Sequence, residues 1–361
     1  SNPNYSLISD TAVYFITWNN SISNLRMIQQ TDVNFTGATP APYFINQVIY
    51  QQTSDYYFGK TDFNNSTDPE YTDGEGWSGP VFTAPLLNQI TALPSTNAVG
   101  TGPQANLTVV YKTISNAPWF NDHRYQMQLS NLPILDTIME GHGSRKFTFN
   151  MNASGLGATS TNFKHSYIGI NDNNGVLVTS NSMFSNYVWR YPHNFNLENK
   201  TSYRMLLPDN TAGTNYLLNM TNLAASTSTV WLYDLSTGKR ITVSLVGGVY
   251  KALVPNGSGS EKELYVAPES QFTTLTANDI RPVNAQGAQP SRFTDLQGFP
   301  GVEFLIITNH ALGSEASSYK AYRNGKFSTE LVYVDELFDQ FSYGITQHPL
   351  AIRNFANTAL A

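Results

Sequence analysis

The sequence predicts a mostly β protein that ends in the opening part of an α/β unit. Over roughly the first two thirds of the 361 residues, short apolar and aromatic runs alternate with clusters of Asn, Gly, Asp and Pro, and helical apolar spacing is scarce. From residue 301 the pattern changes to strand, helix, strand, helix. We therefore expect an N-terminal β-sandwich region that is jelly-roll-like, a small β-meander, and the first βαβα part of an incomplete α/β domain.

Residues 1–225 are predicted to form the β-sandwich region, in one or two β subdomains. Its expected strands share β-branched or aromatic residues at or near period two and are bounded by turn residues; they are residues 11–18, 42–50, 107–114, 124–129, 145–151 and 165–170. Asn173-Asn174-Gly175 predicts a hairpin turn, since Asn and Gly tolerate a positive φ.

Residues 226–300 are predicted to form a β-meander followed by a linker. Residues 229–255 give three apolar runs separated by turn residues at 236–238 and at Gly247-Gly248. Residues 268–300 carry Pro, Gln, Ala and Gly with little periodicity, which is typical of a linker.

Residues 301–361 are predicted to begin a parallel α/β unit. Residues 304–307 and 331–334 are continuous apolar runs, as strands buried on both faces require, and a helix is expected between them at residues 313–322. A short helix over residues 335–341 should end at Gly344, and Pro349 suits the first turn of a last helix. Two strands are too few for such a sheet, so we expect the unit to continue beyond Ala361.

Composition excludes several classes of function. A net charge of −6 without clustered Lys and Arg argues against a nucleic-acid partner. The absence of Cys excludes disulfides, thiolate metal sites and a Cys nucleophile within this chain. No apolar run is long enough to span a bilayer, and the aromatic, Asn- and Thr-rich composition is typical of exported or surface β proteins.

Several motifs resemble the gingipain-type cysteine peptidases, and within them the surface sortases of type IX secretion. The strongest likeness is the segment FLIITNHAL followed by SYKAYR and by LVYVDELFDQFSYGITQHPLAIRNF. Weaker likenesses are the Gly-Glu-Gly-Trp sequence at residues 74–77 and the strand that runs from His165 to Asn171. The matching positions are Gly74, Glu75, Gly76 and Trp77, His165 and Asn171, Phe341, Ser342 and Gly344, and Ile352, Arg353 and Phe355.

The resemblance implies a cysteine peptidase with a Cys–His pair on a caspase-like sheet. In that family both residues lie far downstream of the Ile-Arg-x-Phe helix, so the nucleophile and base are expected beyond Ala361 and none is assigned here. His142, within Gly141-His142-Gly143-Ser144, matches the family's Gly-His-Gly, but it precedes the α/β unit by a whole domain. A β-turn is therefore the preferred interpretation of His142, and whether this chain alone is an enzyme stays open.

The expected function is the non-catalytic N-terminal part of a peptidase that processes C-terminal signals of secreted surface proteins. The implied partners are the rest of its own peptidase domain and protein substrates or outer-membrane secretion components, and the implied location is the cell surface. The alternative is a carbohydrate-binding or adhesin-type β-sandwich, for which Trp77, Trp119, Trp189 and Trp231 are candidate stacking platforms. Buried core residues are the competing interpretation of these four Trp.

No metal site or cofactor is expected, because the six His lack ligand spacing. The acidic loop around Asp68, Glu70 and Asp73 offers hard oxygen ligands of the kind that Ca²⁺ takes, although its spacing does not match an EF-hand. A solvated, turn-rich loop is the competing interpretation.

Overall fold

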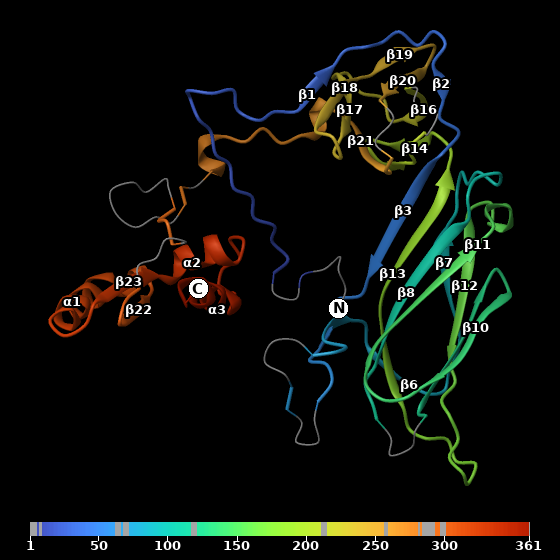
Figure 1. The fold of residues 1–361 in the computed structure, drawn as a ribbon. Coiled ribbons are helices and arrows are strands. Elements are labelled where there is room, and N and C mark those ends of the chain that lie inside the picture. The colour runs from blue at the N-terminus through green and yellow to red at the C-terminus, as the bar shows by residue number, and fades with distance from the viewer. Residues whose placement is uncertain are drawn as a thin grey trace. The chain divides into compact units, whose positions relative to one another are not determined.

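The computed structural model describes residue 6 and residues 9–61, 66–67, 72–116, 121–210, 215–255, 259–280, 282–283, 293–296 and 301–360. The chain forms two compact units (Figure 1). The first comprises residues 1–5 and 25–273, and the second comprises residues 6–24 and 274–361. The most N-terminal residues are thus divided between the units.

A ten-stranded sheet runs through the first unit. Its order is β1 (Ile28–Gln30), β18 (Lys239–Thr242), β17 (Val230–Asp234), β21 (Lys262–Pro268), β15 (Tyr203–Leu207), β3 (Phe44–Gln51), β13 (Asn181–His193), β8 (Ala105–Thr113) and β11 (Gly143–Met151), and β6 (Val81–Thr83) also pairs with β13. All neighbours are antiparallel except β1 and β18. The two halves of the sheet join at one pairing, Leu206 of β15 opposite Ile45 of β3.

Two smaller sheets cover the two halves of the long sheet. The four-stranded sheet has the order β10 (Leu132–Met139), β9 (His123–Leu129), β12 (Ser160–Tyr167) and β7 (Leu86–Pro94). The five-stranded sheet has the order β14 (Asn196–Lys200), β16 (Tyr216–Leu223), β20 (Val249–Val254) and β19 (Ser244–Val246), with β2 (Thr39–Pro40) also paired to β16. A separate two-stranded sheet pairs β4 (Asp55–Tyr57) with β5 (Gly76–Ser78), and η1 (Ala153–Gly155) follows β11.

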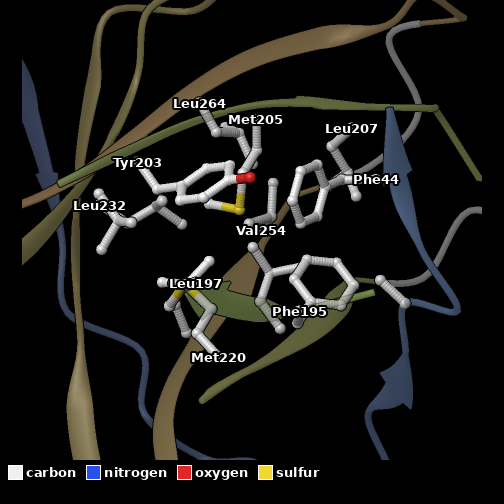
Figure 2. Close-up of a cluster of buried hydrophobic side chains, with 14 of the residues drawn as sticks. Phe44, Phe195, Leu197, Tyr203, Met205, Leu207, Met220, Leu232, Val254 and Leu264 are labelled. Atoms are coloured by element: carbon white, nitrogen blue, oxygen red, sulfur yellow. The ribbon is translucent and has the colours of Figure 1, made fainter. Parts of the chain in front are cut away.

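Each half of the first unit has its own apolar core. The alternation of β9, in which every second residue is buried, is what a strand with one face on a core requires. It contributes Tyr125, Met127 and Leu129 to a core shared with β8 and β13, which includes the fully buried Trp189. The second core, shown in Figure 2, packs Phe44, Met205 and Leu264 against residues of β14, β16 and β20. The first unit is therefore two β-sandwiches that share one continuous sheet (Figure 1).

The second unit contains a short parallel sheet with helices. β22 (Phe304–Thr308) pairs in parallel with β23 (Thr329–Tyr333), connected by η4 (His310–Leu312) and α1 (Gly313–Asn324). α2 (Val334–Phe341) and α3 (Leu350–Leu360) follow, and two short turns, η2 (Glu269–Gln271) and η3 (Ala277–Asp279), lie on either side of the division between the units. Val332, Leu337 and Phe355 are central to its core. The five residues of β22 are only half-buried.

The mostly β fold class and the closing βαβα order are confirmed. The predicted strand at residues 11–18 is wrong: these residues form no strand and pair with none of the described strands, and Tyr14 is 85% exposed. The predicted meander is wrong in one respect. Its middle run is divided at Val243, so that β17–β18 belong to the ten-stranded sheet and β19–β20 to the five-stranded sheet. The physical reason is burial, since Ile241 is in the core whereas Leu245 and Val246 are exposed.

Candidate functional site

The Gly-Glu-Gly-Trp segment forms a glycine-dependent turn and strand. Gly74 has φ +85° and Gly76 has φ +124°, a region that glycine alone adopts without strain. The carboxylate of Glu75 accepts a hydrogen bond from the Thr72 amide at 3.1 Å and one from the Tyr56 hydroxyl. The Lys112 ammonium donates to the carbonyl oxygens of Gly76 at 2.5 Å and Trp77 at 3.3 Å. Burial lowers the pKa of Lys112 to about 8, with the charge of Glu75 acting in the opposite direction.

The structure brings the Gly-His-Gly turn beside this segment. The Tyr57 hydroxyl lies 2.9 Å from Nδ1 of His142. A Cβ atom on Gly74 would lie 3.5 Å from the backbone of Gly143, so the two glycine turns are in contact. The Ser144 amide donates to Asp73 at 3.1 Å. Two motifs that lie far apart in the sequence therefore make one polar cluster at the β4–β5 end of the first unit.

The hydrogen bonds of this cluster are those of a rigid turn. The hydroxyl of Thr113 donates to the carbonyl oxygen of Gly141 at 2.6 Å, and the Arg145 guanidinium donates to those of Glu140 and Gly141. Burial lowers the pKa of His142, opposed by the charge of Asp122, so the imidazole is neutral near pH 7. A neutral imidazole can act as a base, but the chain has no Cys to activate. The geometry suits the interpretation of His142 as a structural turn residue, which stays a prediction.

His165 and Asn171 lie in a different part of the first unit. His165 is in β12, and its ring stacks on Phe163 at 5.5 Å with an interplanar angle of 15°. Burial lowers its pKa to about 4. Asn171 forms an isolated β-bridge with Leu177 around the predicted turn, whose Gly175 has φ +78°. Of this pair, only His165 lines a cavity, which is taken up below.

The C-terminal motif residues are structural. Ser342 and Gly344 end α2: the amides of both donate to the carbonyl oxygen of Phe338, and Gly344 has φ +77°. Phe341 packs edge-on against the fully buried Phe355 at 5.5 Å. Ile352 and Arg353 lie on α3 and are exposed. Phe341, Ser342, Gly344 and Phe355 thus end α2 and pack it on α3.

Sequence reasoning missed a His–Asp pair at the carboxyl ends of the parallel strands. Nδ1 of His310 lies 2.8 Å from Oδ2 of Asp335, and the His310 ring stacks on Tyr333 at 3.9 Å with an interplanar angle of 11°. Both residues directly follow a strand, His310 after β22 and Asp335 after β23. Because ligands of parallel α/β sheets bind at this edge, the position of the two residues in the sequence could have indicated the pair.

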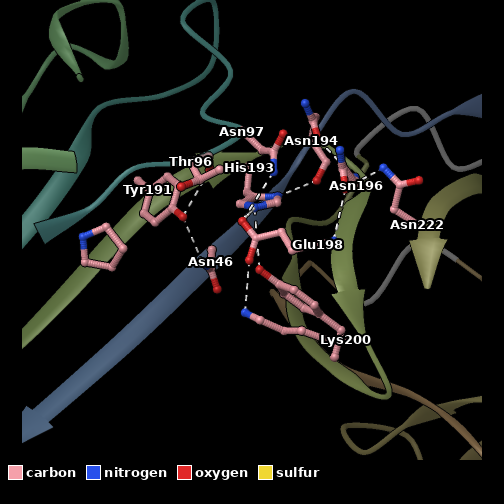
Figure 3. Close-up of polar contacts among 12 residues, drawn as sticks. Asn46, Thr96, Asn97, Tyr191, His193, Asn194, Asn196, Glu198, Lys200 and Asn222 are labelled. Atoms are coloured by element: carbon pink, nitrogen blue, oxygen red, sulfur yellow. Dashed lines mark hydrogen bonds and ion pairs between the residues drawn. The ribbon is translucent and has the colours of Figure 1, made fainter. Parts of the chain in front are cut away.

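A polar network around the buried His193 lies where the chain passes from one sandwich to the other (Figure 3). Nε2 of His193 lies 3.3 Å from Glu198, which also pairs with Lys200 at 3.0 Å and accepts from Asn97 at 3.2 Å. Burial lowers the pKa of His193, although Asn194 and Glu198 oppose this shift. The network satisfies polar groups between the two apolar cores, and every member has a partner, which is the pattern of a structural cluster.

The candidate Ca²⁺ ligands are only partly within the described residues. Asp68 and Glu70 lie outside them, and Asp73 accepts a hydrogen bond from Ser144. Among the described residues, no group of three His, Asp or Glu could hold a metal ion.

The candidate Trp residues differ in their burial. Trp189 is fully buried and Trp119 lies outside the described residues. Trp77 and Trp231 are half-buried, and the guanidinium of Arg240 covers the ring of Trp231 at 4.3 Å. In the part of the chain that the structure describes, no helix has the length and hydropathy needed to cross a bilayer.

Comparison with known proteins gives a family match and a fold match. Residues 298–361 match the sequence model of peptidase family C25. The fold is similar to that of the dimeric latent PorU from Porphyromonas gingivalis, with a TM-score of 0.56, 14% identity, and coverage of 92% of this chain. The chain spans only 29% of that PorU chain. The CBM36-1 domain of a multidomain xylanase from the hindgut metagenome of Trinervitermes trinervoides aligns with 40% of this chain over 96% of its own length, at 12% identity and a TM-score of 0.24.

No curated protein sequence matches the chain. The family resemblance read from the motifs is nevertheless confirmed by the C25 match and the PorU-like fold. Residues 298–361 are therefore similar in sequence to peptidase family C25, and the fold of the chain is similar to that of PorU.

Proposed function

We propose that this chain is the non-catalytic N-terminal part of a PorU-like cysteine peptidase of type IX secretion, one that processes the C-terminal signals of secreted surface proteins at the cell surface. The observation that carries the proposal is the coincidence of two likenesses in one chain. The C25 segment begins at residue 298, and the PorU-like fold extends over 92% of the chain, including the β-sandwiches upstream. The partners of this part are its own peptidase domain and protein substrates.

The chain alone should have no peptidase activity, because thiolate attack is the chemistry of a cysteine peptidase and the chain has no Cys. The measurement is cleavage of a broad fluorogenic peptide library by the purified chain, beside the variant His142→Ala. Equal background rates for both proteins are expected. Cleavage that His142→Ala abolishes would contradict both the assignment and the structural interpretation of His142.

We propose further that the first unit docks protein substrates. In the parent protein, residues 25–273 would be replaced by a short Gly/Ser linker, so that residues 6–24 stay with residues 274–361 as in the compact unit. The expected result is retained cleavage of small peptides and loss of cleavage of whole protein substrates, with folding checked by circular dichroism. Unchanged processing of whole proteins would leave only a spacing role for the sandwiches.

A second candidate function, a surface carbohydrate-binding module, is favoured by one observation. It is an aromatic groove in the sandwich that contains β3, β6, β7, β12 and β13, here called the first sandwich, and its lining side chains are uncharged.

A further inference from the structure

An open groove in the first sandwich has no role in the function proposed for the peptidase. Its volume is about 510 Å³, within the range of small-molecule sites. Residues of β3, β6, β7, β12 and β13 line it, together with Gln52 and the Gly79-Pro80 turn. No Asp, Glu, Lys or Arg is among the lining residues.

One wall of the groove is a set of nearly parallel aromatic rings. Tyr50 of β3 and Tyr187 of β13 are directly opposite in the strand register, with ring centroids 5.2 Å apart and planes at 19°. The ring of Phe184 lies 6.3 Å from that of Tyr50 at 18°. Tyr50 is 44% exposed, so part of this aromatic set is open to a ligand.

The groove also carries polar groups that the protein does not use. The side chains of Gln52, Thr91 and His165 make no hydrogen bond with any residue that the structure describes, although all three are partly buried. Because the groove is open, these three groups are available to hydrogen-bond a polar ligand in place of water. His165 adds no charge near pH 7, because burial lowers its pKa to about 4.

We propose that this groove binds an uncharged oligosaccharide, with a sugar ring against Tyr50 and its hydroxyl groups hydrogen-bonded to Gln52, Thr91 and His165. The inference deepens the second candidate function and does not depend on the peptidase assignment. Side-chain amides, hydroxyls and imidazoles pair with sugar hydroxyls, whereas an ionic ligand would find no opposite charge in the lining. A Pro-rich peptide is the rival occupant, since such peptides dock in aromatic grooves, but it offers few donors to the acceptor atoms of the three polar side chains, because Pro has no N–H.

The test is isothermal titration of the whole chain with a panel of neutral hexasaccharides built from glucose, mannose, xylose, galactose or N-acetylglucosamine, and with a Pro-rich decapeptide. We expect at least one saccharide to bind, and Tyr50→Ala to weaken that binding about tenfold, the effect of losing one ring-stacking contact. Gln52→Ala and Thr91→Val should each weaken it several-fold. The matched control is Tyr322→Ala, because Tyr322 is 64% exposed, lies on α1 in the second unit and does not line the groove.

Thermal unfolding of each variant separates loss of binding from loss of fold. If Tyr50→Ala unfolds, Gln52→Ala and Thr91→Val alone decide the question. The proposal is overturned if no saccharide binds at concentrations up to about 10 mM, a bound weaker than ordinary specific affinities. It is also overturned if binding is unchanged in the groove variants, or if only the peptide binds. None of these outcomes touches the peptidase assignment, which rests on the C25 match and the PorU-like fold and not on the groove.

Discussion

His165 shows how one side chain can connect burial, charge and stability. Its imidazole lies among Phe163, Tyr111 and Phe184, with ring centroids within 6.3 Å, and burial lowers its pKa from 6.5 to about 4. Between those two pH values the unfolded chain binds a proton at this position and the folded chain does not. The contribution of His165 to stability is thus complete above pH 6.5 and is lost as the pH falls towards 4.

We expect His165→Gln to reduce this pH dependence. At pH 4 the titration of His165 should cost the wild-type protein about 3 kcal/mol relative to pH 7, from the pKa difference and about 1.4 kcal/mol per unit. The measurement is the urea midpoint of each protein at pH 7 and pH 4.5. His123, His142 and His193, whose pKa values are also lowered, remain in both proteins, so the difference isolates His165. Parallel pH profiles would contradict the burial of an uncharged imidazole.

Lys112 is a second residue whose role follows from burial. It is 2% exposed, and its ammonium satisfies the carbonyl oxygen of Gly76. Lys112→Met should destabilise the first unit by about 1–3 kcal/mol, because a buried acceptor loses its partner. Lys146→Met, at an exposed position on the neighbouring strand β11, should change stability by no more than about 0.5 kcal/mol. Thermal unfolding of both variants checks the pair, and equal shifts would contradict the assigned bond.

At the residue scale, the sequence could predict which residues belong to motifs but not which side chains surround them. The His at 142 and 165 were both recognisable as motif residues, yet one lies in a hydrogen-bonded turn and the other in an aromatic groove. Their environments are built by β4, β5, β8 and β13, which lie far away in the chain. Local pattern carries no information about such long-range contacts.

Among the secondary-structure elements, α2 has the most constrained end. A Cβ on Gly344 would lie 2.5 Å from Cγ1 of Val13 and 3.2 Å from the ring of Phe15, and Gly344 has φ +77°. The residues that begin the chain therefore pack directly on the last turn of a helix more than three hundred residues later. Their side chains alternate, since Val13 faces Gly344 while Tyr14, Ile16 and Trp18 are at least 58% exposed.

We expect Gly344→Ala to loosen residues 11–16. The Ala side chain would clash with Val13, and a non-glycine residue at this positive φ costs about 1 kcal/mol of backbone strain. Hydrogen exchange at residues 11–16 should accelerate, and Gly325→Ala is the control, because Gly325 has φ −69° and its Cβ would meet only the Tyr322 carbonyl at 3.5 Å. If hydrogen-exchange rates at residues 11–16 are the same in Gly344→Ala and Gly325→Ala, the contact of Gly344 with Val13 and Phe15 does not hold these residues in place.

Period-two alternation predicted β8, β9 and β11 closely because each has one face on a core. The same reasoning failed for residues 11–18, since a strand also needs a partner, and propensity cannot show whether one is present. No strand is predicted at β21, because the three-strand meander is expected to end before its Glu-Leu-Tyr-Val run. The α/β elements were the most predictable: β22 is followed by Asn309, α1 by Gly325, and α2 ends before Gly344.

Across the first unit, the two apolar cores are distinct but share a sheet. Leu107 belongs to one core and Met205 to the other, and both are fully buried. Because β3 pairs with both β13 and β15, we expect the unit to unfold as one cooperative transition. Leu107→Ala and Met205→Ala should each cost about 2–5 kcal/mol and shift the same transition.

Calorimetry, with near-ultraviolet circular dichroism as a second probe, measures whether the first unit unfolds in one transition or in two. Two separated transitions within the first unit, each moved by only one of the variants, would show that the sandwiches fold independently. A single transition moved by both would support the continuous sheet as the element that couples them.

For the whole molecule, the sequence could predict the fold class and the likeness of its C-terminal segment to a peptidase family, because both depend on local pattern and short motifs. It could not predict that one sheet passes through two sandwiches, nor that residues 6–24 join the second unit. The groove was equally hidden, since its wall is made by a cross-strand register between Tyr50 and Tyr187. Register and topology are decided by pairings between distant segments.

The length of β13 restricts how this chain can vary. Its thirteen residues carry Phe184 and Tyr187 of the groove near one end and His193 of the inter-sandwich network at the other. A strand reverses the direction of every following side chain when one residue is added or removed. A single insertion between Tyr187 and Trp189 would therefore turn Trp189 and Tyr191 out of the core. The strand can therefore gain or lose residues only two at a time, or accommodate one extra residue as a bulge like that between Phe184 and Asn186. The number of residues between the groove and the network should accordingly vary among natural sequences in steps of two.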